Sequence, residues 1–183
     1  CPLALYLVSS GIKNLTFFDG DIIEKTNLGR QILYSLEDVG KYKTLVAKKQ
    51  LLKTNPNCKI IAHSENLTDK NINSLLDFDI IIDTNDNWHT SKLINKFCTY
   101  NSLKYIFSSA VNNNIQICLF KNYGAHMCLN CLFPNENDVE LARCETVGIS
   151  SICAGIAGLI TAQKTINTIL KIKDESNILS LIN

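Results

Sequence analysis

The sequence has almost no net charge and no long hydrophobic run. Its formal net charge is +1 at pH 7, so electrostatics favour neither a nucleic acid nor an anionic membrane as a partner. The most apolar run, residues 152–162, is too short to span a bilayer. The opening residues have no basic lead and so lack the form of a signal peptide. We therefore expect a cytoplasmic protein that binds neither a membrane nor a nucleic acid.

Internal repeats and low-complexity linkers are also absent. The chain has 183 residues, of which 46% are hydrophobic and 19% are charged, which is typical of one globular domain over residues 1–183. Eight cysteines without a secretory signal favour reduced thiols, metal ligands or catalysis over a disulfide framework.

Short apolar runs alternate with helical patterns along the chain. Strands are expected at residues 15–18, 58–62, 80–82, 104–110 and 115–120, and the first of these is expected to be buried. Helices are expected at residues 2–10, 41–54, 71–77, 89–100 and 151–171. In the second helix, Leu45, Val46 and Leu52 should share a buried face. The alternation predicts an α/β fold, a Rossmann-like and mostly parallel sheet with helices on both faces.

Two aspartates follow predicted strands, at the edge of the sheet where such folds bind ligands. Asp19 is placed to accept hydrogen bonds from ribose hydroxyls, about 20 residues after a phosphate-binding glycine loop. Counting back puts that loop before Cys1, so we expect the first strand and the glycine loop to be missing from this chain. The alternative is that Asp19 only ends a strand. Asp86 could equally cap the helix that begins near Trp88.

A second polar group consists of Asn27, Arg30, Gln31 and Lys43. Arginine offers a planar fork and lysine a point charge to the oxygens of a nucleotide triphosphate. The alternative is a solvated polar loop followed by an ordinary exposed lysine.

The spacing of these residues resembles a family pattern, D-x-D-x-V-x-x-x-N-L-x-R-Q … G-x-x-K … N-P. Its matching residues here are Asp19-Gly20-Asp21, Glu24, Asn27-Leu28-Gly29-Arg30-Gln31, Val39-Gly40, Lys43 and Asn55-Pro56. Residues 83–87 resemble the D-x-x-D-N segment of the same family, residues 128–134 its zinc knuckle, residues 143–149 its cysteine-bearing loop, and the helix from Ile152 the helix that follows. The family is that of the adenylating enzymes of the ubiquitin-activating (MoeB/ThiF/HesA) type, and the molybdopterin-type branch is the most similar.

The resemblance implies that the chain binds ATP through residues in its first quarter. Asp19 would bind the ribose, Asn27, Arg30 and Gln31 would face the triphosphate, and Lys43 would neutralise it. The implied reaction is attack of a protein carboxylate on the α-phosphate of ATP with release of pyrophosphate. Catalysis of such a reaction is positioning and charge neutralisation.

The resemblance also implies a metal and a nucleophile. Asp86 would hold Mg²⁺ between phosphate oxygens, and the implied catalytic residues are Arg30, Lys43, Asp86 and Cys144. Cys144 is the residue that could accept an acyl group or sulfur, and Arg143 beside it would favour the thiolate. The alternative is that Cys144 is an inert loop cysteine.

Cys128 and Cys131 have the Cys-x-x-Cys spacing of two ligands in a tetrahedral Zn²⁺ site. The sequence has no second Cys-x-x-Cys, and the resemblance places the other pair beyond Asn183. We therefore expect half of a structural zinc site, in a chain that is incomplete at both termini. The alternatives are two buried thiols or a redox pair.

The implied partner is a small ubiquitin-like sulfur-carrier protein that ends in Gly-Gly, as in molybdopterin or thiamine biosynthesis. A homodimer and a sulfurtransferase are further implied partners. Within the family, the alternative is activation of another carboxylate, on a peptide or a modified tRNA base. From other classes, the alternatives are a non-catalytic remnant of the fold and a nicotinamide dehydrogenase, which would leave Arg30, Lys43 and the cysteine pair unexplained.

Overall fold

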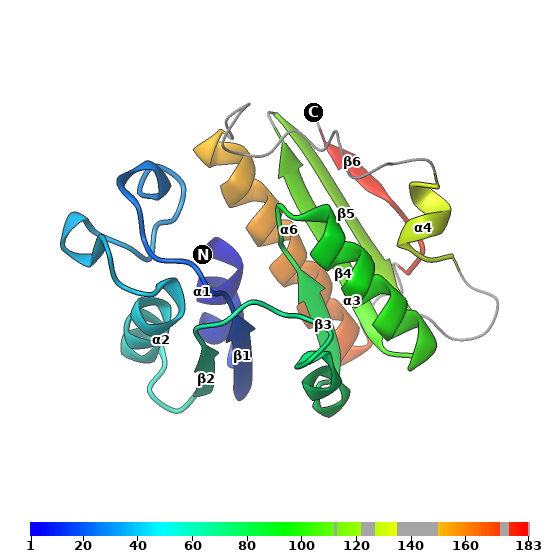
Figure 1. Cartoon of the computed structure of the whole chain (residues 1–183), viewed down its shortest axis with the longest axis horizontal. Coiled ribbons are helices and arrows are strands. Elements are labelled where there is room, and N and C mark those ends of the chain that lie inside the picture. The colour runs from blue at the N-terminus through cyan, green and yellow to red at the C-terminus, as the bar shows by residue number, and fades with distance from the viewer. Residues whose placement is uncertain (112, 122–126, 135–149, 173–175, 183) are drawn as a thin grey trace.

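The strands form two sheets, shown in a computed structural model that describes residues 1–111, 113–121, 127–134, 150–172 and 176–182. In the smaller sheet, β1 (Asn14–Phe18) and β2 (Lys59–His63) pair in parallel. The larger sheet has the order β3-β4-β5-β6, and its strands are β3 (Ile80–Asp83), β4 (Lys104–Val111), β5 (Asn114–Phe120) and β6 (Ser180–Ile182). Strand β3 is parallel to β4, whereas the β4–β5 and β5–β6 pairs are antiparallel. Strands β1 and β3 lie on either side of the division between the sheets (Figure 1).

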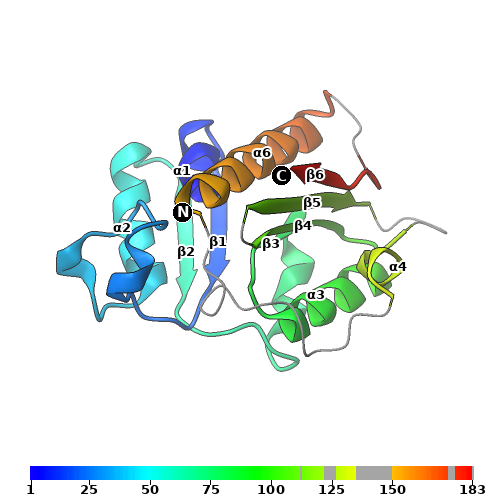
Figure 2. The same cartoon turned by 90° about the horizontal axis from the view of Figure 1, so that it is seen from above.

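Helices cover both faces of the larger sheet. The α-helices are α1 (Pro2–Ser9), α2 (Lys43–Thr54), α3 (Trp88–Tyr100), α4 (Leu129–Leu132) and α6 (Ser151–Leu170), and short 3₁₀ turns lie at Lys25–Asn27, Leu36–Asp38 and Ile72–Asp77. Figure 2 shows α6 on one face of β4 and β5 and α3 on the other. Helix α2 packs against β2 and α1. The Rossmann-like α/β class with parallel strand pairs and helices on both faces is therefore confirmed.

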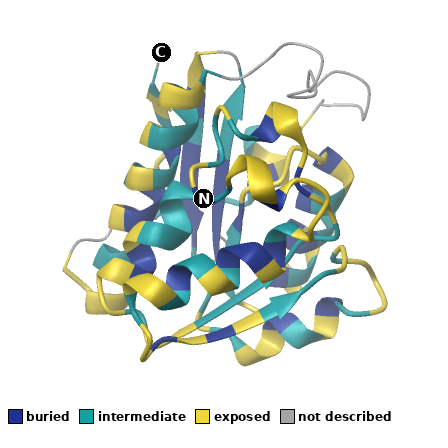
Figure 3. Ribbon diagram, turned by 90° about the vertical axis from the view of Figure 1, so that its left-hand side faces the viewer, coloured by how far each residue is buried: buried dark blue, intermediate teal, exposed yellow. Residues whose placement is uncertain are grey.

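The apolar core of the larger sheet has two layers because successive side chains of a strand point to opposite faces. Tyr105 and Phe107 of β4 belong to the cluster that includes α3 residues, whereas Ile106 between them belongs to the cluster that includes Ala157 of α6. Both layers are buried, which explains why residues 105–107 of β4 and residues 117–120 of β5 are continuously apolar in sequence. Figure 3 shows the same principle for the helices, with exposed residues on their outer sides and buried residues on their inner sides.

Several expectations from sequence need correction. Leu45 does not share the buried face of α2 and is 53% exposed, while Ala47 and Leu51 are buried with Val46. Strand β1 is half-buried rather than buried, because in the described part of the chain it pairs only with β2. The helix expected at residues 71–77 is present as a 3₁₀ helix, Ile72–Asp77. Strand β6 was not expected from the sequence. None of the helices in the described residues is both long and apolar enough to cross a membrane.

Helices α1 and α6 meet at Gly158, where a side chain would not fit. A β-carbon at this position would lie 2.9 Å from the backbone nitrogen of Leu3 and 3.0 Å from the β-carbon of Pro2. A β-carbon at Gly155, three residues earlier in the same helix, would have no neighbour within 4 Å. The contact therefore depends on a glycine at one position of α6 and not at the other.

This pair of glycines gives a prediction about stability. Gly158→Ala should lower the free energy of unfolding by about 1–2 kcal/mol, because forced overpacking costs more than the gain in helix propensity returns. Gly155→Ala should raise it by about 0.5–1 kcal/mol, since only the propensity term applies. Urea denaturation of both variants measures the difference. Equal stability of the two variants would show that α1 moves aside without cost.

Candidate functional site

Asp19 and Asp86 follow the carboxyl ends of β1 and β3, which point the same way (Figure 1). Asp19 is half-buried and Asp86 is exposed. Burial is the largest effect on Asp19 and raises its pKa. A hydrogen bond from the Asp21 N–H and the charge of Lys43 lower the pKa, and the negative charges of Asp21 and Asp86 raise it, so that the net shift is upward. The charge of Asp86 thus acts on Asp19, and both residues follow the carboxyl ends of strands.

Lys43 is the first residue of α2 and is anchored beside Asp19. Its Nζ lies 2.7 Å from Oδ2 of Asp21, and its backbone N–H donates to the carbonyl oxygen of Asp21 at 3.0 Å. The side chain is only 12% exposed. The hydroxyl of Tyr34 donates to the carbonyl of Lys43 at 3.1 Å, and burial together with the charge of Asp19 raises the pKa of Tyr34. Lys43 is thus held in place rather than free in solvent.

The loop between β1 and α2 carries the remaining predicted triphosphate residues. Asn27 is buried, and its Oδ1 accepts the backbone N–H of Glu24 at 3.1 Å, so its side chain fixes the loop itself. The carbonyl of Asn27 accepts the N–H groups of Arg30 and Gln31. Nη1 of Arg30 donates to the carbonyl of Thr26 at 3.0 Å. Oε1 of Gln31 is buried and has no hydrogen-bond partner among the described residues, an arrangement that costs free energy unless a partner binds there.

The turn that carries Asp86 is built on a buried carboxylate that sequence reasoning gave no role. Asp83 is 1% exposed, and its Oδ1 accepts the backbone N–H of Asn85 at 2.9 Å and the Asn85 amide at 2.8 Å. Its Oδ2 accepts the Tyr105 hydroxyl at 2.7 Å, and Ser91 also hydrogen-bonds the carboxylate. Burial raises the pKa of Asp83 despite these donors. Asp83 is the last residue of β3 and opens the polar run of residues 83–87, so nothing in the local sequence distinguishes this anchor from its neighbours.

Asn87, and not Asp86, caps helix α3. Its Oδ1 accepts the backbone N–H of His89 at 3.0 Å and of Thr90 at 3.4 Å. The alternative interpretation of Asp86 as the helix cap is therefore wrong. Asparagine and aspartate cap helices about equally well, so the sequence did not decide between the two neighbours.

The sulfur atoms of Cys128 and Cys131 lie 3.5 Å apart, at the start of α4. Two thiolates on one tetrahedral zinc ion, with Zn–S bonds of about 2.3 Å, would lie about 3.8 Å apart, so the pair fits such a site with a small adjustment. Burial raises the pKa of Cys128, but hydrogen bonds from the Cys131 N–H and thiol, the Asn130 N–H and the Asn95 side chain outweigh it and lower the pKa. Among the described residues, no group of three or more potential ligands occurs. Cys144 and Arg143 lie outside the described residues.

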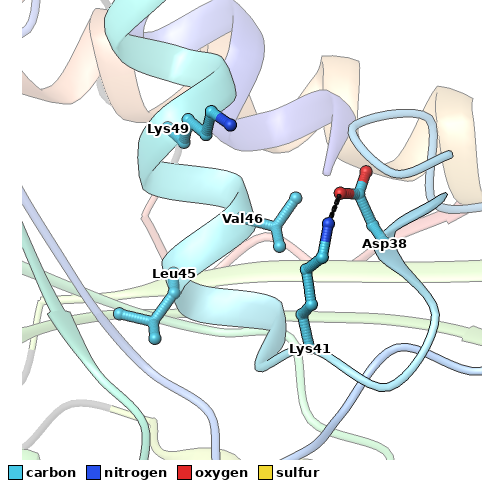
Figure 4. A pocket seen from close by; sticks show the side chains of 5 residues that line it. All are labelled: Asp38, Lys41, Leu45, Val46 and Lys49. Atoms are coloured by element: carbon cyan, nitrogen blue, oxygen red, sulfur yellow. Dashed lines mark hydrogen bonds and ion pairs between the residues drawn. The ribbon is translucent and has the colours of Figure 1, made fainter.

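A surface pocket of about 320 Å³ beside α2 is lined by Asp38, Lys41, Leu45, Val46 and Lys49 (Figure 4). Asp38 pairs with Lys41 at 3.0 Å, and the hydrogen bonds from Lys41 and Ser35 lower the pKa of Asp38 to about 2. None of the residues that the sequence predicts for the nucleotide or metal sites lines this pocket, so the pocket is separate from the site at the strand ends.

Comparison with known proteins relates this chain by sequence to proteins that are named adenylyltransferases. A family model described as "ThiF family" matches residues 1–183. The chain is 31% identical over 171 residues to an adenylyltransferase and sulfurtransferase, UBA4, of Meyerozyma guilliermondii, which covers 92% of this chain and 40% of that protein. It is 29% identical over 177 residues to the sulfur carrier protein adenylyltransferase of Thermus thermophilus, and the match covers 93% of this chain and 65% of that protein.

A solved structure gives the same picture of the fold. The crystal structure of E. coli MccB with ATP has a TM-score of 0.80 and 26% sequence identity, and the match covers 98% of this chain and 58% of that one. The chain thus spans less than two thirds of each of these proteins.

Proposed function

This chain belongs to the ThiF family, whose similar members are named adenylyltransferases, and from that premise we propose that the full-length protein adenylates the C-terminal carboxylate of a ubiquitin-like sulfur-carrier protein. The observation that carries the proposal is the position of Asp19 and Asp86 after the carboxyl ends of β1 and β3, with Lys43 held against Asp21 at the start of α2. Two carboxylates and an anchored lysine suit a nucleotide and its metal. The Thermus relative, by its name, acts on a sulfur carrier protein, and MccB was crystallised with ATP.

In the proposed reaction, a carboxylate oxygen of the carrier attacks the α-phosphate of ATP and the bond to pyrophosphate breaks. Asp19 accepts hydrogen bonds from the ribose. Lys43 exchanges Asp21 for phosphate oxygens, which its position at the start of α2 supports. Arg30 leaves the Thr26 carbonyl and binds the triphosphate through its guanidinium fork. Gln31 donates its amide N–H groups to the triphosphate, and Asn27 holds the loop in shape.

Mg²⁺ fits the proposed site because Asp86 is an exposed carboxylate whose charge already disfavours the ionised form of Asp19. A divalent cation bound by Asp86 would relieve this repulsion and, when bound, would draw charge from the phosphate oxygens. Zn²⁺ fits the Cys128–Cys131 pair by the separation of the two sulfur atoms. The other two zinc ligands would come from outside the described residues.

Three further parts of the proposal concern partners. Cys144 accepts the acyl group from the adenylate with release of AMP, or it accepts sulfur. Alternatively, a separate sulfurtransferase delivers the sulfur, as the combined name of the UBA4 relative suggests. The protein forms a homodimer in the cytoplasm. Support for the dimer comes from large apolar side chains exposed along residues 22–45, namely Ile22, Ile32, Leu36, Val39, Tyr42 and Leu45.

Pyrophosphate exchange into ATP tests the proposed function directly. With the full-length protein, exchange of labelled pyrophosphate should occur only when a carrier with a free C-terminal Gly-Gly carboxylate is present, because the adenylate must form before the reaction can reverse. The same carrier with an amidated C-terminus is the matched control and should give none. If no Gly-Gly carrier supports exchange but a short peptide with a free carboxylate does, the substrate assignment is wrong while adenylation stands.

A further inference from the structure

Asn95 is a polar side chain in the middle of α3 that is only 1% exposed. A buried amide must find hydrogen-bond partners to offset the loss of water. Its Oδ1 accepts the backbone N–H of Leu129 at 3.0 Å, across 34 positions of sequence. The Asn95 side chain also contributes to the lowered pKa of Cys128 through a hydrogen bond to its sulfur. A bond that lowers a thiol pKa stabilises the thiolate, so the amide N–H is the group that donates.

The Leu129 N–H needs such a partner. It is the first N–H of α4, and the first N–H groups of a helix have no acceptor within the helix. Cys128 precedes α4 but makes no side-chain capping bond, and Leu129 is fully buried, so water does not reach it. Asn95 therefore supplies from a neighbouring helix the capping acceptor that α4 lacks.

One amide thus holds both the sulfur of Cys128 and the peptide that follows it. With the backbone fixed at Leu129 and the sulfur fixed by the amide N–H, the Cys128 side chain is restricted to one orientation, and the Cys131 sulfur lies 3.5 Å from it. A ligand pair that is ordered before the metal arrives loses less conformational entropy on binding.

We propose that Asn95 is a positioning residue for metal binding, which orients Cys128 and its sulfur for Zn²⁺ and attaches the Cys128–Cys131 pair to α3. This inference rests on the zinc site of the proposed function and not on the adenylation reaction. Partners of this kind around metal ligands contribute about 10–100-fold to metal affinity.

Zinc affinity of the full-length protein, measured by competition with a chromogenic chelator, tests the inference. Asn95→Ala should weaken zinc binding by about 10–100-fold. Asn95→Asp keeps an oxygen for the Leu129 N–H but has no N–H to donate to sulfur, and it should weaken binding similarly. Asn101→Ala is the matched control, because Asn101 lies at the end of the same helix and donates to the Phe97 carbonyl at 2.9 Å instead. Its affinity should stay within about threefold of the wild type.

Hydrogen–deuterium exchange of the zinc-free protein gives a second readout. Mass spectrometry should show faster exchange around Leu129 in Asn95→Ala than in Asn101→Ala, because the Leu129 N–H has lost its acceptor. If Asn95→Ala does not fold, Asn95→Asp carries the test. Wild-type affinity in the folded Asn95 variants would overturn the inference alone. A wild-type protein that holds no zinc would overturn it together with the zinc site, while pyrophosphate exchange would still report on adenylation.

Discussion

Replacing Cys128 by serine in the full-length protein is expected to remove about one bound zinc ion per chain. A hydroxyl is a far poorer ligand for zinc than a thiolate, and the site would keep Cys131 without its neighbour at 3.5 Å. Complete structural zinc sites have about 10–16 kcal/mol of apparent binding free energy at pH 7, and their ligands must be deprotonated. A serine hydroxyl stays protonated at this pH, so the site that has lost one thiolate should be empty after purification. Metal analysis by inductively coupled plasma mass spectrometry measures the stoichiometry.

Cys153→Ser provides the control for this substitution. Cys153 lies on α6, half-buried against the β4–β5 face, away from the start of α4. The Cys153→Ser substitution removes one thiol from the protein but leaves Cys128 and Cys131 unchanged, so the zinc content should stay at about one ion per chain. Stoichiometric zinc in Cys128→Ser would contradict the assignment. Of the two alternatives, a pair of buried thiols is wrong because Cys131 is exposed and Cys128 is half-buried, so the redox pair would remain. Loss of both thiols on treatment with diamide would support it.

The order of helices and strands could be predicted from sequence because local signals agree with the fold. The apolar runs at residues 80–82, 104–110 and 115–120 are strands, and the helical patterns predicted at residues 41–54 and 151–171 correspond to α2 (Lys43–Thr54) and α6 (Ser151–Leu170). The errors arise where tertiary packing decides. Leu45 fits the apolar stripe of α2, but the helix turns Ala47 and Leu51 inward and leaves Leu45 exposed. No local pattern fixes the rotation of a weakly amphipathic helix.

The candidate site could be predicted only in part, for a related reason. Asp19 and Asp86 follow strands, so the sheet rule brought them to one edge without knowledge of any contact. Asp83 and Asn95 act through Tyr105 and Leu129, which are 22 and 34 positions away in sequence. Hydrogen bonds at such separations leave no local signature. Asp83 opens the polar run of residues 83–87 and Asn95 precedes a lysine, so neither residue is marked by its neighbours in the sequence.

The network beneath the strand ends shows why the exposed residues can be placed well. Asp83 holds Asn85 by two bonds from within the sheet, and Asn87 fixes the first turn of α3. Asp86 lies between these two anchors, so its backbone is determined on both sides while its side chain remains exposed. A proposed metal ligand needs this combination, since a carboxylate on a mobile loop would lose more entropy when it binds.

Asp86→Asn in the full-length protein is therefore expected to lower the rate of adenylation on the order of a hundredfold or more. The amide keeps the shape of the side chain but removes the charge that would hold Mg²⁺, and several kcal/mol of transition-state stabilisation go with it. The melting temperature should hardly change, because Asp86 is exposed and Asn87 supplies the helix cap. Adenylation is followed by pyrophosphate release with saturating carrier, and thermal unfolding is followed by circular dichroism.

Two matched variants separate charge from structure in this experiment. Asp79→Asn removes an exposed carboxylate next to the opposite end of β3, so the adenylation rate should stay at the wild-type value. Asn87→Ala removes the cap of α3 and should lower the free energy of unfolding by about 1 kcal/mol, with Asp86 still present. Titration with Mg²⁺ completes the test, because a lost ligand should raise the metal concentration needed for half-maximal rate in Asp86→Asn only. An unchanged rate in Asp86→Asn would show that the carboxylate binds no metal, and the magnesium assignment would then be wrong.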